Sequence, residues 1–398
     1  MSALISPVTT IVIAQLFGTS LWFSTNSAAG SLMAAWHIGE SDIGLLTNAV
    51  QLGFISGTLT FALSGLADRF DASGIFTVCA LLGALFNALF ALVADGLATG
   101  LPLRFSVGFC LAGIYPLGMK LIVSWAPQRA GGALSLLLAM LTLGTALPHF
   151  VRFAGTDLSW KATIIISSGL AMIAAVMIWR LGDGPHLIRS AKARQFRLGR
   201  VLTAFSVPTF RASALGYFGH CWELYAFWTL VPTLIMTAGL AAEGSRALSV
   251  MSFLVIGIGS LGCILGGWWS QRIGSGRTAA IALFASGCCC LFFPLIPSGE
   301  TGILLALLLF WGTTVIADSP HFSALSARAS PPEIVGSALT LQNAIGFSIT
   351  MVSIQLGTSV IDNLGAYTAW LLLPGPILGL WGLAPLWRPS STLTHRSL

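Results

Sequence analysis

The sequence predicts an all-α membrane protein with twelve transmembrane helices in two pseudo-symmetric six-helix bundles and both termini in the cytoplasm. Three observations lead to this prediction. The chain is 56% hydrophobic and only 8% charged, whereas a soluble globular protein carries about a quarter charged residues. Its apolar residues form long uncharged runs, and its basic residues gather in alternate connections. Because this small number of polar residues cannot cover a water-facing surface, we interpret the apolar runs as transmembrane helices.

Apolar runs of about 20 residues, the length that crosses a bilayer, define the elements in order. Those of the first half cover 9–32, 43–64, 75–95, 102–125, 130–153 and 162–181, and those of the second half cover 209–236, 247–270, 278–297, 302–327, 335–358 and 367–387. No basic residue precedes the first run and no convincing cleavage site follows it. We therefore interpret this run as a retained helix rather than a signal peptide.

The long connection between the two sets of runs divides the chain. It carries five basic residues, Arg189, Lys192, Arg194, Arg197 and Arg200. We expect an N-terminal six-helix bundle over 1–181, a basic cytoplasmic linker over 182–208 and a C-terminal six-helix bundle over 209–398.

The basic residues test the number of spans and their orientation. With a cytoplasmic N-terminus and alternating spans, fourteen of the nineteen Lys and Arg residues fall on the cytoplasmic side. Only Arg152, Lys161 and Arg246 fall outside, and Arg104 and Lys120 lie within a span. Because Lys and Arg are disfavoured in short translocated loops, this asymmetry supports both the twelve spans and the orientation.

The two halves also share a pattern. Three positions recur 204 residues later in the chain, Pro116, Pro127 and Gly132 as Pro320, Pro331 and Gly336. The common offset favours a duplicated half. A tandem repeat of membrane bundles is typical of transporters with a solute site between the halves.

Composition excludes other classes of partner. The net charge of +6 comes with no basic patch interleaved with aromatic residues, so we expect no nucleic-acid partner. The seven cysteines lie inside apolar runs, where we expect packing rather than disulfides. We expect no cofactor and no resident metal. The expected partners are a small-molecule substrate, protons and the lipid bilayer, and we expect a monomer in the cell inner membrane.

The loop after the second run carries a motif. It reads Ser64-Gly-Leu-Ala-Asp68-Arg69, and a weaker copy after the eighth run ends in Gln271-Arg272. Together with Arg104-Phe-Ser-Val-Gly108 in the fourth run, twelve spans and a basic central loop, the chain resembles the major facilitator superfamily of secondary transporters over nearly its whole length.

This resemblance implies a gating role for Asp68, Arg69, Gln271 and Arg272 at the cytoplasmic ends of the helices. The carboxylate of Asp68 is expected to meet a helix N-terminus or an arginine across that face. The motif is degenerate, because Ser64 and Asp71 replace its two glycines. An ordinary solvated loop charge is the alternative for Asp68.

Four ionisable residues in two runs are candidates for proton coupling, since a charge within the bilayer is costly and marks function. His220 and Glu223 lie three residues apart, on one helix face where the side chains can meet. Asp318 and His321 form a second pair with the same spacing. By resemblance, the seventh and tenth spans line a central cavity together with the first and fourth. A structural hydrogen-bonded pair is the alternative for His220 and Glu223.

Basic and aromatic residues are the candidates for substrate binding. Lys120 follows Gly113 and Pro116 in the fourth span, and such residues often mark a helix that faces a cavity. If Lys120 faces the cavity, its ammonium group attracts an anion. If it does not, its long side chain extends to the membrane interface. Arg104 lies about 160° around the helix from Lys120 and shares a face with Tyr115. By resemblance, Arg104 assists coupling between substrate and proton, with anchoring of the outer end of the span as the alternative.

The fifth and seventh spans add further candidates. His149 in the fifth span forms a basic entrance with Arg152, unless Arg152 extends outward instead. In the seventh span, Trp222 and Tyr225 together with Trp228 can stack on a ring-bearing solute or pack an interface. Asn26, Gln51, Gln342 and Asn343 are expected mainly to form helix–helix hydrogen bonds.

We therefore predict a secondary active transporter that moves a small solute, in particular an organic anion, across the inner membrane by alternating access with proton coupling. Proton-driven efflux of a drug or metabolite is the alternative; the separation of Gly144 from Pro148 in the fifth span weakens it. Divalent metal transport and a membrane-embedded metal-dependent hydrolase using the two His–carboxylate pairs are less favoured. No hydrolase motif supports the latter.

Overall fold

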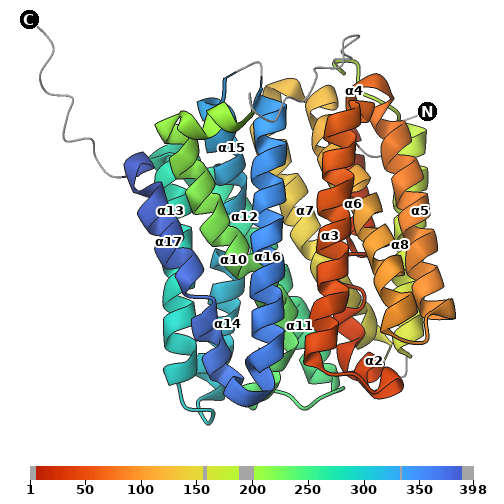
Figure 1. Ribbon diagram of the computed structural model, residues 1–398, viewed down its shortest axis with the longest axis vertical. Coiled ribbons are helices and arrows are strands. Elements are labelled where there is room, and N and C mark those ends of the chain that lie inside the picture. Colours follow the sequence, from red (N-terminus) through yellow and green to blue (C-terminus); the bar gives the residue numbers. More distant parts are fainter. Residues whose placement is uncertain (1–5, 156–158, 188–200, 332–333, 388–398) are drawn as a thin grey trace, which may run out of the picture.

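The computed structural model describes residues 6–155, 159–187, 201–331 and 334–387, except for the side chains of Asp68 and residues 129–131. Every regular element in this part of the chain is a helix (Figure 1). The predicted all-α class is therefore confirmed. The short helices α4 (Leu66–Arg69) and α2 (Ala29–Trp36) lie at opposite ends of the molecule, and these ends are called the α4 side and the α2 side.

The first predicted run is not one continuous helix. It forms α1 (Pro7–Thr19), a turn, the 3-10 helix η1 (Asn26–Ala28) and then α2. Helix α1 begins with a Ser6 side chain that accepts from the Thr9 amide, followed by Pro7, which needs no amide partner at this position. The break leaves the backbone carbonyl oxygens of Leu21 and Trp22 free to accept hydrogen bonds from a buried side chain, which is described below.

The remaining helices of the first half, defined as residues 6–187, follow the predicted runs closely. They are α3 (Glu40–Ser64), α5 (Ala72–Val93), α6 (Leu97–Trp125), α7 (Ala130–Ala154) and α8 (Trp160–Leu181). Pro102 and Pro116 lie inside α6, and Pro148 lies inside α7.

In the second half, defined as residues 201–387, the eighth, tenth and twelfth runs are interrupted, the twelfth by a turn between a 3-10 helix (Gly365–Leu371) and α17. Its helices are α10 (Pro208–Thr237), α11 (Arg246–Gly257), α12 (Gly259–Ile273), α13 (Ser275–Phe292), α14 (Thr301–Thr314), α15 (Ser319–Ala329), α16 (Val335–Leu364) and α17 (Pro374–Leu383). The tenth run breaks between α14 and α15, with Asp318 at the N-cap of α15 and Pro320 in its first turn. The eighth run is divided at Ile258, between the end of α11 and the start of α12.

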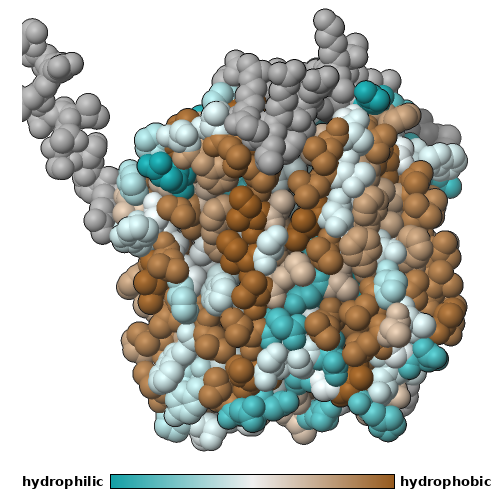
Figure 2. All heavy atoms as spheres, viewed as in Figure 1, coloured by the Kyte–Doolittle hydropathy of each residue, from teal (hydrophilic) through white to brown (hydrophobic). Residues whose placement is uncertain are grey.

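Nine stretches within the described residues are long and apolar enough to cross a membrane. One of them, Val335–Leu386, contains both α16 and α17, and α1 is apolar but has only 13 residues. The predicted number of twelve spans therefore stays a prediction. Large apolar side chains such as Leu92, Phe284 and Trp381 are exposed on the outer surface, and Figure 2 shows apolar residues covering much of one face. Such a surface suits lipid contact.

The two halves meet along two seams. Helix α3 packs against α16, and α7 packs against α11 and α12. In Figure 1, α3 and α16 run side by side between the first-half helices and the second-half helices. A solute that passes between the halves would have to cross the space bounded by these two seams.

Candidate functional site

The space between the halves is open on one side and nearly closed on the other. On the α4 side, a cavity of about 640 Å³ lies between α7, α12 and α15 and reaches Met119 of α6 and Leu339 of α16. On the α2 side, the residues between the halves leave only about 40 Å³. The cavity on the α4 side is therefore the larger of the two and has room for a small solute.

A cluster of aromatic rings fills the centre between these two spaces. The first half contributes Trp22 and Phe23 from the break after α1 and Phe54 from α3, and the second half contributes Tyr225, Trp228 and Phe347. The rings of Trp22 and Tyr225 stack with centroids 5.5 Å apart, and those of Phe54 and Phe347 are 4.6 Å apart. Tyr225 therefore belongs to this cluster, and the substrate-stacking role predicted for it remains a prediction.

Two groups in this cluster are polar and buried. The indole Nε1 atoms of Trp22 and Trp228 have no hydrogen-bond partner among the described residues. Both side-chain polar atoms of Gln51, a buried residue of α3, are likewise without a described partner. Buried donors and acceptors are normally paired, so these groups are available to a polar solute that separates the rings.

Two of the aromatic residues predicted to bind substrate lie at the edge of this cluster or outside it. Tyr115 lies at its edge, with its ring 6.5 Å from Phe54. Trp222 points elsewhere, because its Nε1 donates to the Leu371 carbonyl oxygen over 2.8 Å and so ties α10 to the segment before α17. Trp22, Phe54 and Phe347 were not predicted from the sequence, because only the packing of the break after α1 against α3 and α16 brings them together.

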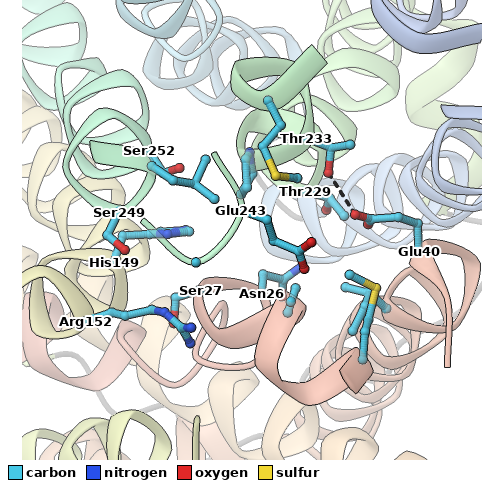
Figure 3. A pocket seen from close by; sticks show the side chains of 18 residues that line it. Asn26, Ser27, Glu40, His149, Arg152, Thr229, Thr233, Glu243, Ser249 and Ser252 are labelled. Atoms are coloured by element: carbon cyan, nitrogen blue, oxygen red, sulfur yellow. Dashed lines mark hydrogen bonds between the residues drawn. The ribbon is translucent and has the colours of Figure 1, made fainter. Parts of the chain in front are cut away.

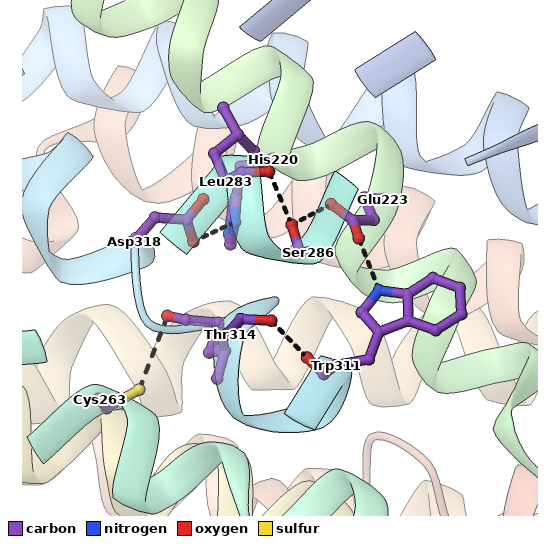
Figure 4. A network of polar contacts seen from close by, with 9 residues as sticks. His220, Glu223, Cys263, Leu283, Ser286, Trp311, Thr314 and Asp318 are labelled. Atoms are coloured by element: carbon purple, nitrogen blue, oxygen red, sulfur yellow. Dashed lines mark hydrogen bonds and ion pairs between the residues drawn. The ribbon is translucent and has the colours of Figure 1, made fainter. Parts of the chain in front are cut away.

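The four predicted coupling residues pair differently from the sequence expectation. His220 Nδ1 lies 2.7 Å from Asp318 Oδ1, and both side chains are almost fully buried (Figure 4). The contact joins α10 to the break before α15 rather than two residues of one helix. The expected pairing at three-residue spacing is therefore wrong, because the break turns Asp318 toward α10.

Glu223 has its own set of donors within the second half. Its Oε1 accepts from Trp311 Nε1 at 2.7 Å and from Cys290 Sγ at 3.3 Å, and its Oε2 accepts from Ser286 Oγ at 2.9 Å. The carboxylate thereby connects α10 to α13 and α14 (Figure 4). His321 is separate again, since it lines the cavity on the α4 side.

Metal binding by these groups has no geometric support. No group of three or more His, Cys, Asp and Glu side chains that could hold a metal ion is found in the part of the chain that the structure describes.

Arg104 is fully buried in the first half and heavily hydrogen-bonded. Its Nη1 donates to Asn87 Oδ1 at 2.8 Å and to Ser24 Oγ at 3.3 Å, while its Nη2 donates to the carbonyl oxygens of Trp22 and Leu21 at 2.7 and 3.2 Å. The guanidinium thus fixes the break after α1, and with it the backbone of Trp22. The substrate-binding role predicted for Arg104 remains a prediction.

Lys120 lies at the end of α6 nearest α4. Its Nζ donates to the Ala67 carbonyl oxygen of that short helix. Asp68 of the predicted gate belongs to the same helix, but its side chain is outside the described residues. Arg69 is exposed at the end of α4.

The second predicted gate segment lies at the edge of the open cavity. Gln271 lines the cavity on the α4 side, and the guanidinium of Arg272 lies 4.1 Å from the ring centre of Trp268. The gating role predicted for Gln271 and Arg272 remains a prediction.

The small pocket on the α2 side gathers charged residues from both halves (Figure 3). His149 and Arg152 of α7 line it, together with Glu40 at the start of α3 and Glu243 from the segment before α11. The basic entrance predicted for His149 and Arg152 remains a prediction. Thr233 Oγ1 of α10 donates to Glu40 Oε1 at 3.0 Å and so joins the two halves. The two acidic residues escaped the sequence analysis because charges at span ends usually face water.

Comparison with known proteins agrees with this architecture. The model of the family described as the Major Facilitator Superfamily matches residues 11–354. The chain is 24% identical over 384 residues to the inner membrane metabolite transport protein YgcS of Escherichia coli (strain K12), covering 87% of this chain and 83% of that protein. It is also 24% identical over 361 residues to the 3-(3-hydroxy-phenyl)propionate transporter of the same organism, covering 87% and 86%. The family predicted from the loop motif and the charge pattern is confirmed: the chain belongs to the Major Facilitator Superfamily and is a multi-pass membrane transporter of small solutes, not an enzyme.

Proposed function

We propose that this transporter carries a small aromatic carboxylate across the inner membrane by alternating access, coupled to protons. The observation that carries the proposal is the aromatic cluster supplied by both halves, with Trp22 stacked on Tyr225 and two buried indole N–H groups without a described partner. A planar ring that enters between these side chains keeps their stacking contacts. The name of one relative, a 3-(3-hydroxy-phenyl)propionate transporter, combines an aromatic ring with a carboxylate and supports this substrate class.

The proposed topology has twelve spans, six in each bundle, with the α4 side in the cytoplasm. The basic residues support it, since fourteen of nineteen fall on that side in this arrangement. The same division assigns 1–181 and 209–398 to the two bundles and 182–208 to a cytoplasmic linker. In this orientation the cavity of about 640 Å³ faces the cytoplasm. The working form is proposed to be a monomer.

The proton is proposed to bind at the His220–Asp318 contact. The two side chains are 2.7 Å apart and connect α10 to the N-cap of α15, where the tenth run is broken. A change of charge at this contact would therefore change how α10 and α15 are held together. His321, three residues after Asp318, lines the cavity on the α4 side and offers a route for protons. Glu223 remains a candidate for the same role, although all three of its contacts already use the carboxylate as an acceptor.

Flux into proteoliposomes tests the proposal with two matched acids. Benzoate and cyclohexanecarboxylate carry the same charge and nearly the same size, but only benzoate has an aromatic ring. With a proton gradient directed inward, we expect benzoate to accumulate and to reach half-saturation at a concentration about threefold to tenfold lower, because ring stacking contributes about 0.5–1.5 kcal/mol.

The matched variants are Tyr225→Leu, within the aromatic cluster, and Trp381→Leu, on the outer surface where Trp381 is 74% exposed. Only Tyr225→Leu should abolish the preference for benzoate. Equal transport of both acids by the unmodified protein would contradict the aromatic substrate class. Accumulation driven only by the opposite proton gradient would instead support proton-driven efflux.

A further inference from the structure

A buried amide on α3 has both of its polar atoms unpaired within the part of the chain that the structure describes. Gln51 is fully buried, and neither its Oε1 nor its Nε2 has a hydrogen-bond partner among the described residues. A buried amide of this kind costs free energy, because no hydrogen bond replaces its lost contacts with water. A polar ligand group that pairs with Gln51 would therefore be stabilised there.

The register of α3 directs Gln51 away from the first half. Gly53 and Gly57 mark the face of α3 that packs against α6. A Cβ atom on Gly53 would overlap the Phe105 carbonyl oxygen, and one on Gly57 would lie 2.6 Å from that of Phe109. Gln51 precedes Gly53 by two residues, which places it about 160° around the helix. Its side chain therefore leaves α3 on the face opposite α6.

The neighbours of Gln51 on this face contact the second half. Asn48 and Phe54 lie three residues before and after Gln51, and residues at this spacing are neighbours on a helix surface. Asn48 Nδ2 donates to the Met351 carbonyl oxygen at 3.0 Å, and the ring of Phe54 lies 4.6 Å from that of Phe347. Both partners belong to α16. Gln51 therefore lies between two contacts that join the halves, beside the aromatic cluster.

Further polar atoms on α3 surround the same part of the cluster. Asn48 Oδ1 and Thr58 Oγ1 are buried and have no partner among the described residues. Thr58 follows Phe54 by four residues and is its neighbour on the helix surface. The ring of Phe54 is thus accompanied on both sides by unpaired polar groups, and Gln51 is the only one of these residues with both a donor and an acceptor of its amide unpaired.

The chemistry of these groups distinguishes between possible ligand groups. An amide carbonyl oxygen only accepts a hydrogen bond, an amide nitrogen only donates, and a hydroxyl does both. A hydroxyl of the ligand can therefore donate to an acceptor such as Gln51 Oε1 or Asn48 Oδ1 while it accepts from a donor. A carboxylate only accepts, so it would leave both of these oxygens unpaired. An unsubstituted ring would leave every one of these groups unpaired.

We propose that the transported aromatic acid carries a hydroxyl group on its ring and that Gln51 binds this hydroxyl. The inference rests on the proposed aromatic substrate and names the substituent of its ring. Gln51 is then a residue that determines specificity. A ring without the hydroxyl leaves the buried amide unpaired, and a site built to bind a hydroxyl discriminates against such a ligand.

Binding to the purified protein in detergent, measured by isothermal titration calorimetry, tests the proposal. The probes are 3- and 4-hydroxybenzoate and the matched 3- and 4-methylbenzoates, in which a methyl group of nearly the same size forms no hydrogen bond. We expect at least one hydroxy acid to bind the unmodified protein about tenfold more tightly than its methyl partner. Gln51→Met nearly keeps the length of the side chain and removes both polar atoms, so this preference should disappear.

A stability measurement and a control variant separate recognition from a structural role. Gln51→Met should unfold at a temperature no lower than the unmodified protein, because it removes two unpaired polar atoms from the interior. Gln342→Met is the matched control and should keep the hydroxyl preference. Gln342 is also a buried glutamine, on α16, and lies about 140° around that helix from Phe347. A lower unfolding temperature of Gln51→Met, with equal weakening of all four acids, would indicate a structural role and overturn the inference.

Two further outcomes would also overturn it. One is equal binding of hydroxy and methyl acids by the unmodified protein, and the other is a hydroxyl preference that persists in Gln51→Met. The proposed function fails separately, when benzoate and cyclohexanecarboxylate are transported equally. A hydroxyl preference that depends on Gln51 would then still assign the hydroxyl site, and only the aromatic class would be rejected.

Discussion

Single buried side chains hold the helices of each half in place. In the first half, the Arg104 guanidinium joins α6 to Asn87 of α5 and to the break after α1. In the second half, the Glu223 carboxylate joins α10 to α13 and α14 through Ser286 and Trp311. A buried charge persists only where donors or acceptors surround it. Each charge therefore fixes one wall of the space between the halves.

Arg104→Gln tests whether the hydrogen bonds of the Arg104 guanidinium stabilise the first half. The variant loses most of the hydrogen bonds to Asn87, Ser24, Leu21 and Trp22, and we expect a loss of about 3 kcal/mol of stability. Since Trp22 loses its anchor, the half-saturating concentration of benzoate should also rise. Thermal unfolding in detergent and flux measure the two effects. Arg272→Gln, at an exposed guanidinium over Trp268, is the control. An unchanged unfolding temperature of Arg104→Gln would show that these hydrogen bonds do not contribute to stability.

The roles of Asp318 and Glu223 separate in a paired experiment. Asp318→Asn should abolish proton-driven accumulation and leave solute exchange intact, because the His220–Asp318 contact then has no charge change. Glu223→Gln should lower stability by about 2 kcal/mol, since three donors lose a charged acceptor. Accumulation, exchange and unfolding temperature are measured for both variants. If Glu223→Gln unfolds normally and fails to accumulate solute, then Glu223 is the coupling residue.

At the scale of helices, the seam between α3 and α16 closes the α2 side. Asn48 Nδ2 donates to the Met351 carbonyl oxygen at 3.0 Å, and Gln355 Nε2 donates to Ser41 Oγ at 2.9 Å. Gly44 allows the closest approach, because a Cβ there would overlap the Thr358 hydroxyl. In the proposed alternating-access cycle these polar bonds break when the α2 side opens, so the seam is expected to set part of the free energy between the two conformations.

Gly44→Ala should separate α3 from α16 and shift the protein toward opening on the α2 side. The readout is a Ser252→Cys background, because Ser252 is fully buried in the pocket on the α2 side. We expect the rate at which a membrane-impermeant maleimide labels this cysteine to rise about threefold or more, since inserting a methyl group into a packed contact costs about 1–3 kcal/mol. Gly302→Ala, at the start of α14 where a Cβ meets nothing within 4 Å, is the control. Equal labelling of the two variants would show that this approach does not control closure.

At the scale of the whole molecule, the charge distribution predicts the orientation in the membrane. A C-terminal fusion to a fluorescent protein that folds only in the cytoplasm should be bright, and a fusion to a phosphatase active only outside should be inactive. A fusion placed at Gly299, between α13 and α14, should give the opposite result. A bright fluorescent fusion at Gly299 would contradict the proposed topology.

Most of the fold could be predicted from the sequence, whereas much of the site could not. The predicted runs correspond to the helices because apolar length is a local property that the bilayer selects. His220 and Glu223 share the continuous helix α10, yet each side chain contacts a different neighbouring helix, so their spacing along the chain did not reveal their partners. The break before Asp318 redirects that carboxylate to another helix, and helical spacing along the chain cannot register such a turn.

By itself, the sequence determined a helical membrane transporter of one superfamily, because composition, charge asymmetry and a loop motif are read along a single chain. Only the tertiary structure decided which side is closed, which carboxylate faces which donor, and that Glu243 rests on the first turn of α2. These contacts join residues from separate helices, some within one half and some between the two halves, so they depend on how the helices pack in three dimensions.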